Sequence, residues 1–256
     1  MEANKELRLQ QRLLLLLERR YTRQIRAEIS RASVAMIAEF ELTGAEPALP
    51  LDHERNMRAI FDELISASVQ AFGIRVLEQG DGKSMTPLER KGFADFLMRI
   101  AAEYILAEAT RQVITKITTT TRSQIIEQVR SGYAEGWGIS KISRAMSSAV
   151  PSISRSRASL IARTETHNAA NTGAFQAASQ SSLPFDKIWR SVSDDRTRDS
   201  HSDMNGIRVP MDQPFEVPRS DGGVDLMMHV GDRSGGSAGN TINCRCGIGF
   251  VRPLKQ

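Results

Sequence analysis

The sequence predicts an α+β protein, in which a helical N-terminal half is followed by a small α+β module with short antiparallel strands and long loops. Up to about residue 150, apolar residues recur at spacings of three and four, which is typical of amphipathic helices. After Ser182 the pattern changes to short alternating segments and to loops rich in glycine, aspartate and serine. We therefore expect a helical docking or scaffold region over residues 1–120 and an α+β module over residues 121–256.

Glycine, proline and capping residues divide the N-terminal half into helices. A first amphipathic helix is expected to continue to about Phe40, because Gly44 and two prolines follow it. Asp52 is the expected N-cap of a second helix, which should end at a turn over residues 80–82. These signals predict two long helices before residue 80.

The third predicted helix has a capping-box signature at its start. Thr86 is the expected cap, Pro87 occupies the first helical position, and Glu89 follows the cap by three residues. The apolar pattern continues to Ile117, and the β-branched threonines at 118–121 are expected to mark a bend or boundary.

Two more helices are predicted before the strands begin. The first surrounds Ile125 and ends at the glycines of residues 132–138. The second should be capped by Ser152 or Ser154 and extend over residues 155–178.

Short strands are predicted over residues 188–192, 207–209 and 242–251, where apolar and polar residues alternate. Pro210 ends the second of them. Residues 222–239 are rich in glycine, aspartate and serine, and we expect a long surface loop there.

Composition and missing motifs exclude several classes of function. The chain has 256 residues, 40% of them apolar, and no apolar run approaches the roughly 20 residues that span a bilayer. No signal-peptide pattern is present, so we expect a protein made in the cytoplasm and no membrane partner. Phosphate-loop, dinucleotide, Gly-x-Ser-x-Gly and His-Glu-x-x-His motifs are missing as well, and no motif indicates a small-molecule substrate.

The positive charge is concentrated in two places. The net charge is +4, and residues 1–31 account for it with eight basic and four acidic side chains. A second basic stretch extends from Arg144 to Arg163. Such patches bind phosphate, but they also form solvated helix faces or meet acidic protein partners. The candidate DNA-binding residues are Arg19, Arg20, Arg23, Arg26, Arg155 and Arg157.

Glu165 is a polar residue on an otherwise apolar stripe of the helix predicted over residues 155–178. At helical spacing it shares this stripe with Ile161, Asn168 and Thr172. Since buried polar groups must be paired, hydrogen bonds that fix the helix to the sheet are expected here. The functional alternative makes Glu165 a general base or a ligand.

The two cysteines and a histidine form a possible zinc site. In a strand, Cys244 and Cys246 would point to the same face and, with His201, offer three ligands. A fourth ligand could come from Asp203, His167, His229 or water. The alternative is that two small, reduced thiols pack where the last strand meets the helix.

The order of several short fragments resembles a known family. The fragments are Ala162-Arg163-Thr164-Glu165, Trp189, Asp195-Arg196-Thr197-Arg198 with His201 and Gly206, Gly231-Asp232 with Ser234, and Ile242-Asn243-Cys244-Arg245-Cys246. Together they look like the Mu F-like minor head proteins of tailed bacteriophages, also called phage head morphogenesis proteins. The resemblance begins near Ser123. The chain has Val230 and Arg233 where the family often has proline, so a less rigid loop is expected there.

The resemblance implies a minor capsid protein of the virion head, assembled in the host cytoplasm. Its implied partners are the portal protein and other head proteins, and its implied role is head morphogenesis and handling of packaged double-stranded DNA, without catalysis. The polar residues of the matching fragments are then expected to form one structural network: Arg163, Glu165, Asp195, Arg198, His201 and Asn243.

Two other functions compete with this one. The first is a metal-dependent hydrolase of DNA or cell wall that uses His201, Glu165 and the two cysteines. The second is a DNA-binding protein without sequence preference that is delivered with the virion.

Overall fold

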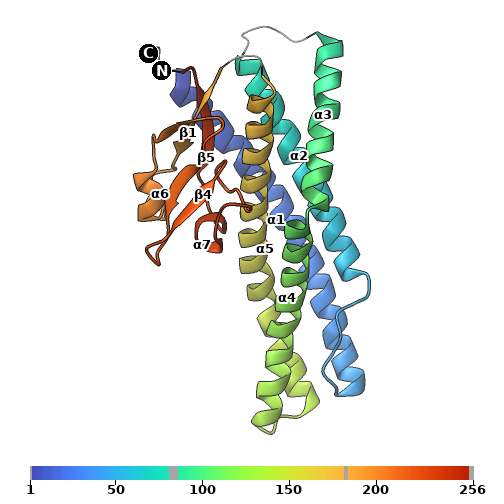
Figure 1. Ribbon diagram of the computed structural model, residues 1–256. Coiled ribbons are helices and arrows are strands. Elements are labelled where there is room, and N and C mark those ends of the chain that lie inside the picture. The colour runs from blue at the N-terminus through green and yellow to red at the C-terminus, as the bar shows by residue number, and fades with distance from the viewer. Residues whose placement is uncertain (1, 81–85, 182–183, 254–256) are drawn as a thin grey trace. The chain divides into compact units, whose positions relative to one another are not determined.

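The structure, a computed structural model, describes residues 2–80, 86–181 and 184–253, and the side chains of residues 2–7, 79–80 and 108–109 are outside this description (Figure 1). The helices are α1 (Glu2–Thr43), α2 (His53–Gly80), α3 (Pro87–Leu106), α4 (Glu108–Ala134), α5 (Ile139–Ser179), α6 (Asp199–Asp203) and α7 (Ala238–Thr241). The strands are β1 (Asp186–Arg190), β2 (Arg208–Pro210), β3 (Phe215–Pro218), β4 (Val224–Met227) and β5 (Gly247–Val251). The predicted α+β class is confirmed. None of the helices, over the described residues, is long and apolar enough to cross a bilayer.

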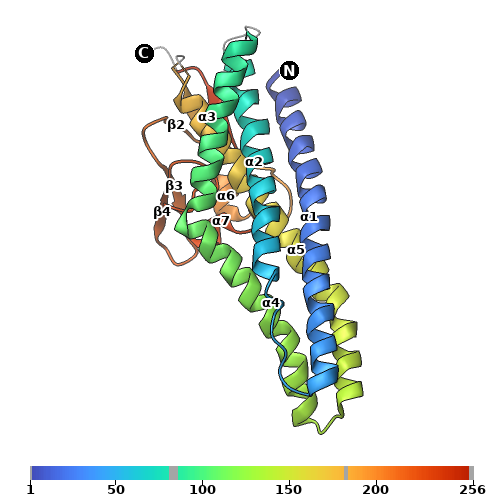
Figure 2. The ribbon, with the colours of Figure 1, turned by 90° about the vertical axis from the view of Figure 1, so that its right-hand side faces the viewer.

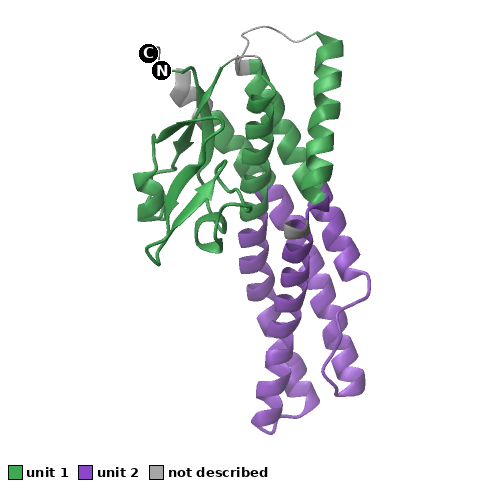
Figure 3. Cartoon of the chain, viewed as in Figure 1, with its two compact units in different colours: residues 1–17, 63–105, 163–256 green, residues 18–62, 106–162 purple. Residues whose placement is uncertain are grey.

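The chain forms two compact units, coloured separately in Figure 3. Unit 1 contains residues 1–17, 63–105 and 163–256, and unit 2 contains residues 18–62 and 106–162. Helices α1, α2 and α5 each contribute residues to both units. Residue 120, where the sequence analysis placed a boundary, lies inside α4.

Unit 2 is held by an apolar core between α1, α4 and α5. Its buried side chains are Met36, Ile37, Phe40, Ile125, Ile126, Val129, Ile142, Met146 and Val150. Glu28, also buried, is hydrogen-bonded to His53 at 2.7 Å and to Arg31 at 2.8 Å. Pairing of this kind offsets the cost of burying the carboxylate.

Unit 1 packs α5 closely against α2. Gly173 on α5 lies so near α2 that a Cβ atom there would be 2.6 Å from the Val69 carbonyl oxygen. In the same unit α2 lies beside α3, where Gly73 faces the Leu97 side chain (Figure 2). Glycine at both positions permits approaches that a side chain would prevent.

The strands of unit 1 form two small antiparallel sheets. One has the order β2-β1-β5, with Trp189 opposite Ile248, and the other is the hairpin of β3 and β4. The buried Trp189 ring meets Phe215 of β3 edge to face at 5.5 Å between centroids. Aromatic contacts of this type add to the burial of apolar area. They connect the two sheets through one core.

Lys187 is fully buried on β1. Its ammonium donates to the Met228 carbonyl at 2.6 Å and to the Met211 carbonyl at 3.3 Å. The rings of Phe175 and Phe215 lie 5.1 and 5.3 Å from it. Burial lowers the pKa of Lys187 to about 8. Through these hydrogen bonds, Lys187 connects β1 to the segments that follow β2 and β4.

Several predicted boundaries are confirmed. Helix α1 ends at Thr43, just before Gly44 at φ +68°, and α2 begins directly after Asp52. At the start of α3 the Glu89 amide donates to Thr86 Oγ1 at 3.3 Å, and the Thr86 amide donates to Glu89 Oε2 at 2.9 Å. This is the reciprocal pairing of a capping box. The turn expected over residues 80–82 falls partly on residues 81–82, outside the described part of the chain.

Two predicted helix boundaries are wrong. The break expected at threonines 118–121 lies instead at Ala107, and α4 continues through the threonines. Their hydroxyls donate to carbonyls four residues earlier, as Thr121 does to Ile117 at 2.8 Å, so the helix accommodates them. The start expected near residue 155 is also wrong, because α5 includes Pro151 and forgoes one backbone hydrogen bond there.

Two predictions about the strands also need correction. The loop expected over residues 222–239 contains β4, which pairs with β3 across a turn where Gly222 has φ +84°. The strand expected over residues 242–251 begins only at Gly247. Asn243 has φ +59°, a left-handed conformation that redirects the chain. Both cysteines therefore lie in a loop that precedes β5.

Replacing Gly173 by alanine should destabilise unit 1, because the new Cβ would overlap the backbone of Val69. We expect the free energy of unfolding to fall by about 1–3 kcal/mol, measured by urea denaturation. Gly92→Ala on α3 is the matched control, since nothing lies within 4 Å of a Cβ there. That variant should be as stable as the parent or more stable. Equal stability of Gly173→Ala and Gly92→Ala would contradict the close packing.

Candidate functional site

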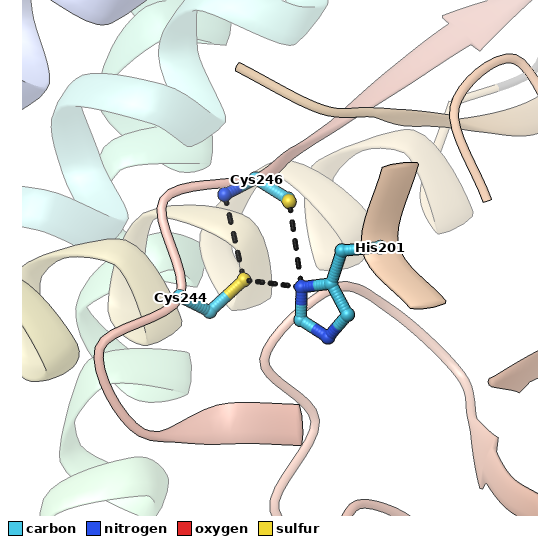
Figure 4. A group of neighbouring side chains, drawn as sticks. All are labelled: His201, Cys244 and Cys246. Carbon is cyan, nitrogen blue, oxygen red and sulfur yellow. Dashed lines mark hydrogen bonds between the residues drawn. The ribbon is translucent and has the colours of Figure 1, made fainter. Parts of the chain in front are cut away.

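His201, Cys244 and Cys246 form a buried cluster in unit 1. The imidazole Nδ1 lies 3.5 Å from the Cys244 sulfur and 3.6 Å from the Cys246 sulfur. Figure 4 shows both sulfurs pointing toward this nitrogen. Both cysteines are free thiols. Each of the three residues offers one ligand atom, and these atoms all lie within 4.8 Å of one another.

His201 is positioned by β1 and the turn that follows it. The Ser191 hydroxyl donates to the His201 carbonyl, and the Ser191 amide donates to Asn205 Oδ1 at 3.0 Å. The Trp189 ring meets the imidazole edge to face at 5.3 Å between centroids. These contacts place α6 against the end of β1.

The loop that carries the cysteines is held by polar side chains of α5. The Asn243 amide donates to Thr164 Oγ1 at 2.9 Å. Asn171 donates to the Cys246 carbonyl at 3.2 Å and accepts from the Ile248 amide at 3.0 Å. Asn171 thus satisfies the same backbone groups that a neighbouring strand would satisfy.

The hydrogen bonds around Asn240 determine the tautomer of His201. Asn240 Nδ2 donates to Asp225 Oδ2 at 2.8 Å and to the Pro218 carbonyl at 3.2 Å. Both of these partners can only accept, so Asn240 Oδ1 must face the imidazole Nε2, which lies 3.1 Å away. Nε2 therefore carries the proton, and the lone pair of Nδ1 points at the two sulfurs.

The two thiols have unequal acidity. Hydrogen bonding from Cys244 and contact with His201 lower the pKa of Cys246. The same pairing, together with burial, raises the pKa of Cys244. Cys246 is therefore the sulfur that ionises more readily.

A small pocket opens beside the cluster. Its lining includes Val192, Thr197 and three arginines: Arg196, Arg198 and Arg245. Arg245 forms a bidentate pair with Asp194, and this pairing holds the pKa of that carboxyl well below its usual range. Arg198 donates to the Ile242 carbonyl at 2.6 Å. Arg196 lies 3.6 Å from the Asp194 carboxylate, so all three cations are engaged by other acceptors.

Glu165 lies in a second polar group. It pairs with Arg233, and both side chains are largely buried. Asp232 accepts from the amides of Met228 and Ser234, each at 2.8 Å, and so stabilises the loop that carries Arg233. This loop, expected to be less rigid than in the resembled family, is anchored to α5.

The comparison with known protein families covers the segment that carries this cluster. Residues 123–248 match the family described as Phage Mu protein F like protein. This segment belongs to the phage Mu protein F-like family. The chain is also 27% identical over 132 residues to the Minor head protein GP7 of Bacillus phage SPP1. That match covers 50% of this chain and 40% of the relative. No solved structure matches the chain.

The Mu F-like segment begins at Ser123, where the sequence resemblance placed it. It brings together most of the predicted polar residues. Arg163 donates to Asn243 Oδ1 at 2.8 Å, next to the loop of the cysteines. Asp195 is exposed, and its neighbour Asp194 forms the ion pair with Arg245. Of the ligands considered for a metal, Asp203, His167 and His229 lie outside the three-residue cluster, over the described residues.

Sequence reasoning missed Arg233, Arg245 and Asn240. Burial of Glu165 requires a cationic partner, but helical spacing says nothing about which arginine supplies it. Asn240 lies in a stretch rich in glycine and serine, and no pattern distinguishes it there. Only the folded loops bring these side chains to the cluster and to Glu165.

The candidate DNA-binding arginines differ in exposure. Arg19, Arg20, Arg23 and Arg26 of α1 are exposed, and so is Arg155 of α5. Arg157 is half-buried and donates to the Ile117 carbonyl at 3.2 Å within unit 2. Burial also lowers the pKa of Arg157. This arginine therefore contributes to packing.

Glu165→Gln should strongly destabilise the protein, because Arg233 would remain buried without a carboxylate. The free energy of unfolding should fall by about 3–5 kcal/mol in urea denaturation. Adding Arg233→Met should restore most of this loss. Glu54→Gln, at the exposed pair with Arg58, is the control and should change little. If Glu165→Gln and Glu54→Gln were equally mild, the Glu165 pair would have no structural role.

Proposed function

We propose that this chain is a minor head protein of a tailed bacteriophage, assembled in the host cytoplasm and retained in the virion head. In this proposal it associates with the portal protein and other head proteins and assists head morphogenesis without catalysis. The observation that carries the proposal is the Mu F-like match over residues 123–248. The relative in phage SPP1, named a minor head protein, supports the same assignment.

The state of the ionisable groups supports a role without turnover. Glu165 pairs with Arg233, and Asp194 pairs with Arg245. A carboxylate that acts as a general base must be free and within reach of its substrate. Glu165, the base of the hydrolase alternative, does not line the pocket beside His201.

Exposed leucines on α1 support docking to another head protein. Leu9 and Leu16 are seven residues apart on this helix, and their exposed fractions are 38% and 63%. Residues at this spacing share a helix face. Such a face fits a groove between helices of a partner, which is one recurring mode of protein recognition.

Quantitative mass spectrometry of purified particles tests this proposal. The chain should co-purify with heads in copies far below those of the major capsid protein. The double variant Leu9→Glu, Leu16→Glu should lower incorporation, because charge opposes burial in an apolar groove. Leu88→Glu, at an exposed position on α3, is the control. Particles that assemble normally and never contain the chain would refute the proposal.

DNA contact is a second candidate function, and one observation favours it. Arg19, Arg23 and Arg26 are exposed on α1 at spacings of four and three, so they share one face. Arg20 is exposed beside them. A row of this kind can follow a DNA backbone by neutralising phosphates.

Substituting the four arginines by glutamine tests this contact. Binding to duplex DNA should weaken. The slope of the logarithm of the binding constant against the logarithm of the salt concentration should decrease in magnitude by up to about 3.6. The matched control removes the same charge at other exposed cations: Arg90, Lys91, Arg99 and Lys116. Equal affinities of the two variants would exclude the α1 face as the contact.

A further inference from the structure

We propose that His201, Cys244 and Cys246 bind one Zn²⁺ ion, with a water molecule as the fourth ligand. The imidazole Nδ1 and the two sulfurs are the protein ligands. This inference rests on the geometry of unit 1 and does not depend on the proposed role in the phage head.

The spacing of the three ligand atoms fits a tetrahedral zinc ion. Zinc–sulfur bonds of about 2.3 Å and zinc–nitrogen bonds of about 2.0–2.1 Å place sulfur and nitrogen about 3.6 Å apart at a tetrahedral angle. The two sulfurs lie 3.5 and 3.6 Å from His201 Nδ1. Both sulfur–nitrogen separations therefore already match those around a bound zinc, and the two sulfurs lie within 4.8 Å of each other.

The surroundings of His201 match those of a metal-bound histidine. Ligating histidines usually donate the remaining ring N–H to a carboxylate or carbonyl, which fixes the tautomer. Here Nε2–H donates to Asn240 Oδ1 at 3.1 Å, and Asn240 is fixed in turn by Asp225 at 2.8 Å. This leaves Nδ1 as a lone pair directed at two thiols. One thiol can donate a hydrogen bond to Nδ1, whereas a cation satisfies all three atoms at once.

The ligand types favour zinc over hard cations. Thiolates select soft or borderline metals, and imidazole is a common zinc ligand, whereas Mg²⁺ and Ca²⁺ prefer oxygen. Two thiolates also balance the charge of Zn²⁺, and their protons leave to solvent on binding. The pocket lined by Val192, Thr197 and Arg196 gives solvent access to the cluster, so water can complete the coordination.

Zinc at this position would join segments that are distant along the chain. His201 belongs to α6, which follows β1, and the cysteines belong to the loop before β5. The ion would therefore connect the segment that leaves β1 with the segment that enters β5, at the end of the antiparallel pair where Arg190 lies opposite Gly247. A bound metal stabilises the folded state by mass action, so unfolding should depend on free zinc.

Elemental analysis of the full chain tests the proposal. Protein prepared with zinc and dialysed without chelator should contain about one zinc per chain, which is the stoichiometry of a single mononuclear site. Chelation should lower the melting temperature, and zinc should restore it. Cobalt should replace zinc and give the thiolate charge-transfer absorption of a tetrahedral site. Zinc should also protect both thiols from a thiol reagent in the native protein.

Variants separate ligands from neighbours. Cys244→Ser, Cys246→Ser and His201→Ala should lose stoichiometric zinc, whereas Asn240→Ala should retain the site with about 10–100-fold lower affinity. His229→Ala is the matched control, since it removes a buried imidazole outside the cluster and should keep the metal.

Three outcomes would overturn the proposal. The first is wild-type protein that contains less than about a tenth of an equivalent of zinc, where a mononuclear site would hold one ion. The second is a set of ligand variants that bind zinc as well as His229→Ala does. The third is that the thiols react equally fast with and without zinc. The thiol and cobalt measurements use the wild-type chain, so they decide the matter even if a cysteine variant fails to fold.

Discussion

Side chains of α5 hydrogen-bond to the backbone of β5 and of the loop before it, in the way that a neighbouring β-strand would. The arrangement of the Mu F-like segment depends on these hydrogen bonds. Thr164 and Asn171 hydrogen-bond to the backbone of residues 243, 246 and 248. Without Asn171, the buried amide of Ile248 would lack this partner, at a cost of about 1–3 kcal/mol. Because these bonds place the loop, they also place Cys244 and Cys246 opposite His201.

Buried charged side chains of unit 1 connect segments that are distant along the chain. Lys187 on β1, Glu165 on α5 and Arg233 in the loop after β4 are each satisfied by a partner from a distant part of the chain. Such contacts are costly to form and more costly to leave half-made. They therefore favour one arrangement of helix, sheets and loops over alternatives in which the same apolar surfaces meet differently.

Local signals predicted the elements whose boundaries are local. The capping box at Thr86 and Glu89 and the left-handed Gly44 were recognisable because their hydrogen bonds and backbone angles involve near neighbours. The break at Ala107 was not recognisable from the sequence, because alanine favours helix and no glycine or proline occurs there. Lys187 was missed for a related reason: a lysine in an alternating segment is expected to face water, and only tertiary contacts explain its burial.

The candidate site was predictable in composition but not in geometry. His201 and the cysteine pair were identified from residue type, yet the reason given for their convergence, a shared face of a strand, was wrong. The sulfurs converge because Asn243 turns the chain and the Cys246 amide donates to the Cys244 sulfur at 3.4 Å. Loop conformation of this kind follows from tertiary contacts rather than from periodicity.

Each of the two units is built from segments that are not contiguous in the sequence, and this affects which fragments of the chain can keep a complete core. Leu14 of α1 and Phe72 and Val76 of α2 share an apolar core with Trp189 and Ile248. A polypeptide shortened to residues 123–248 would lack those three side chains. The apolar residues that pack against them would then be exposed to water. The region that matches the family therefore relies, in this chain, on helices that precede it to cover its apolar core.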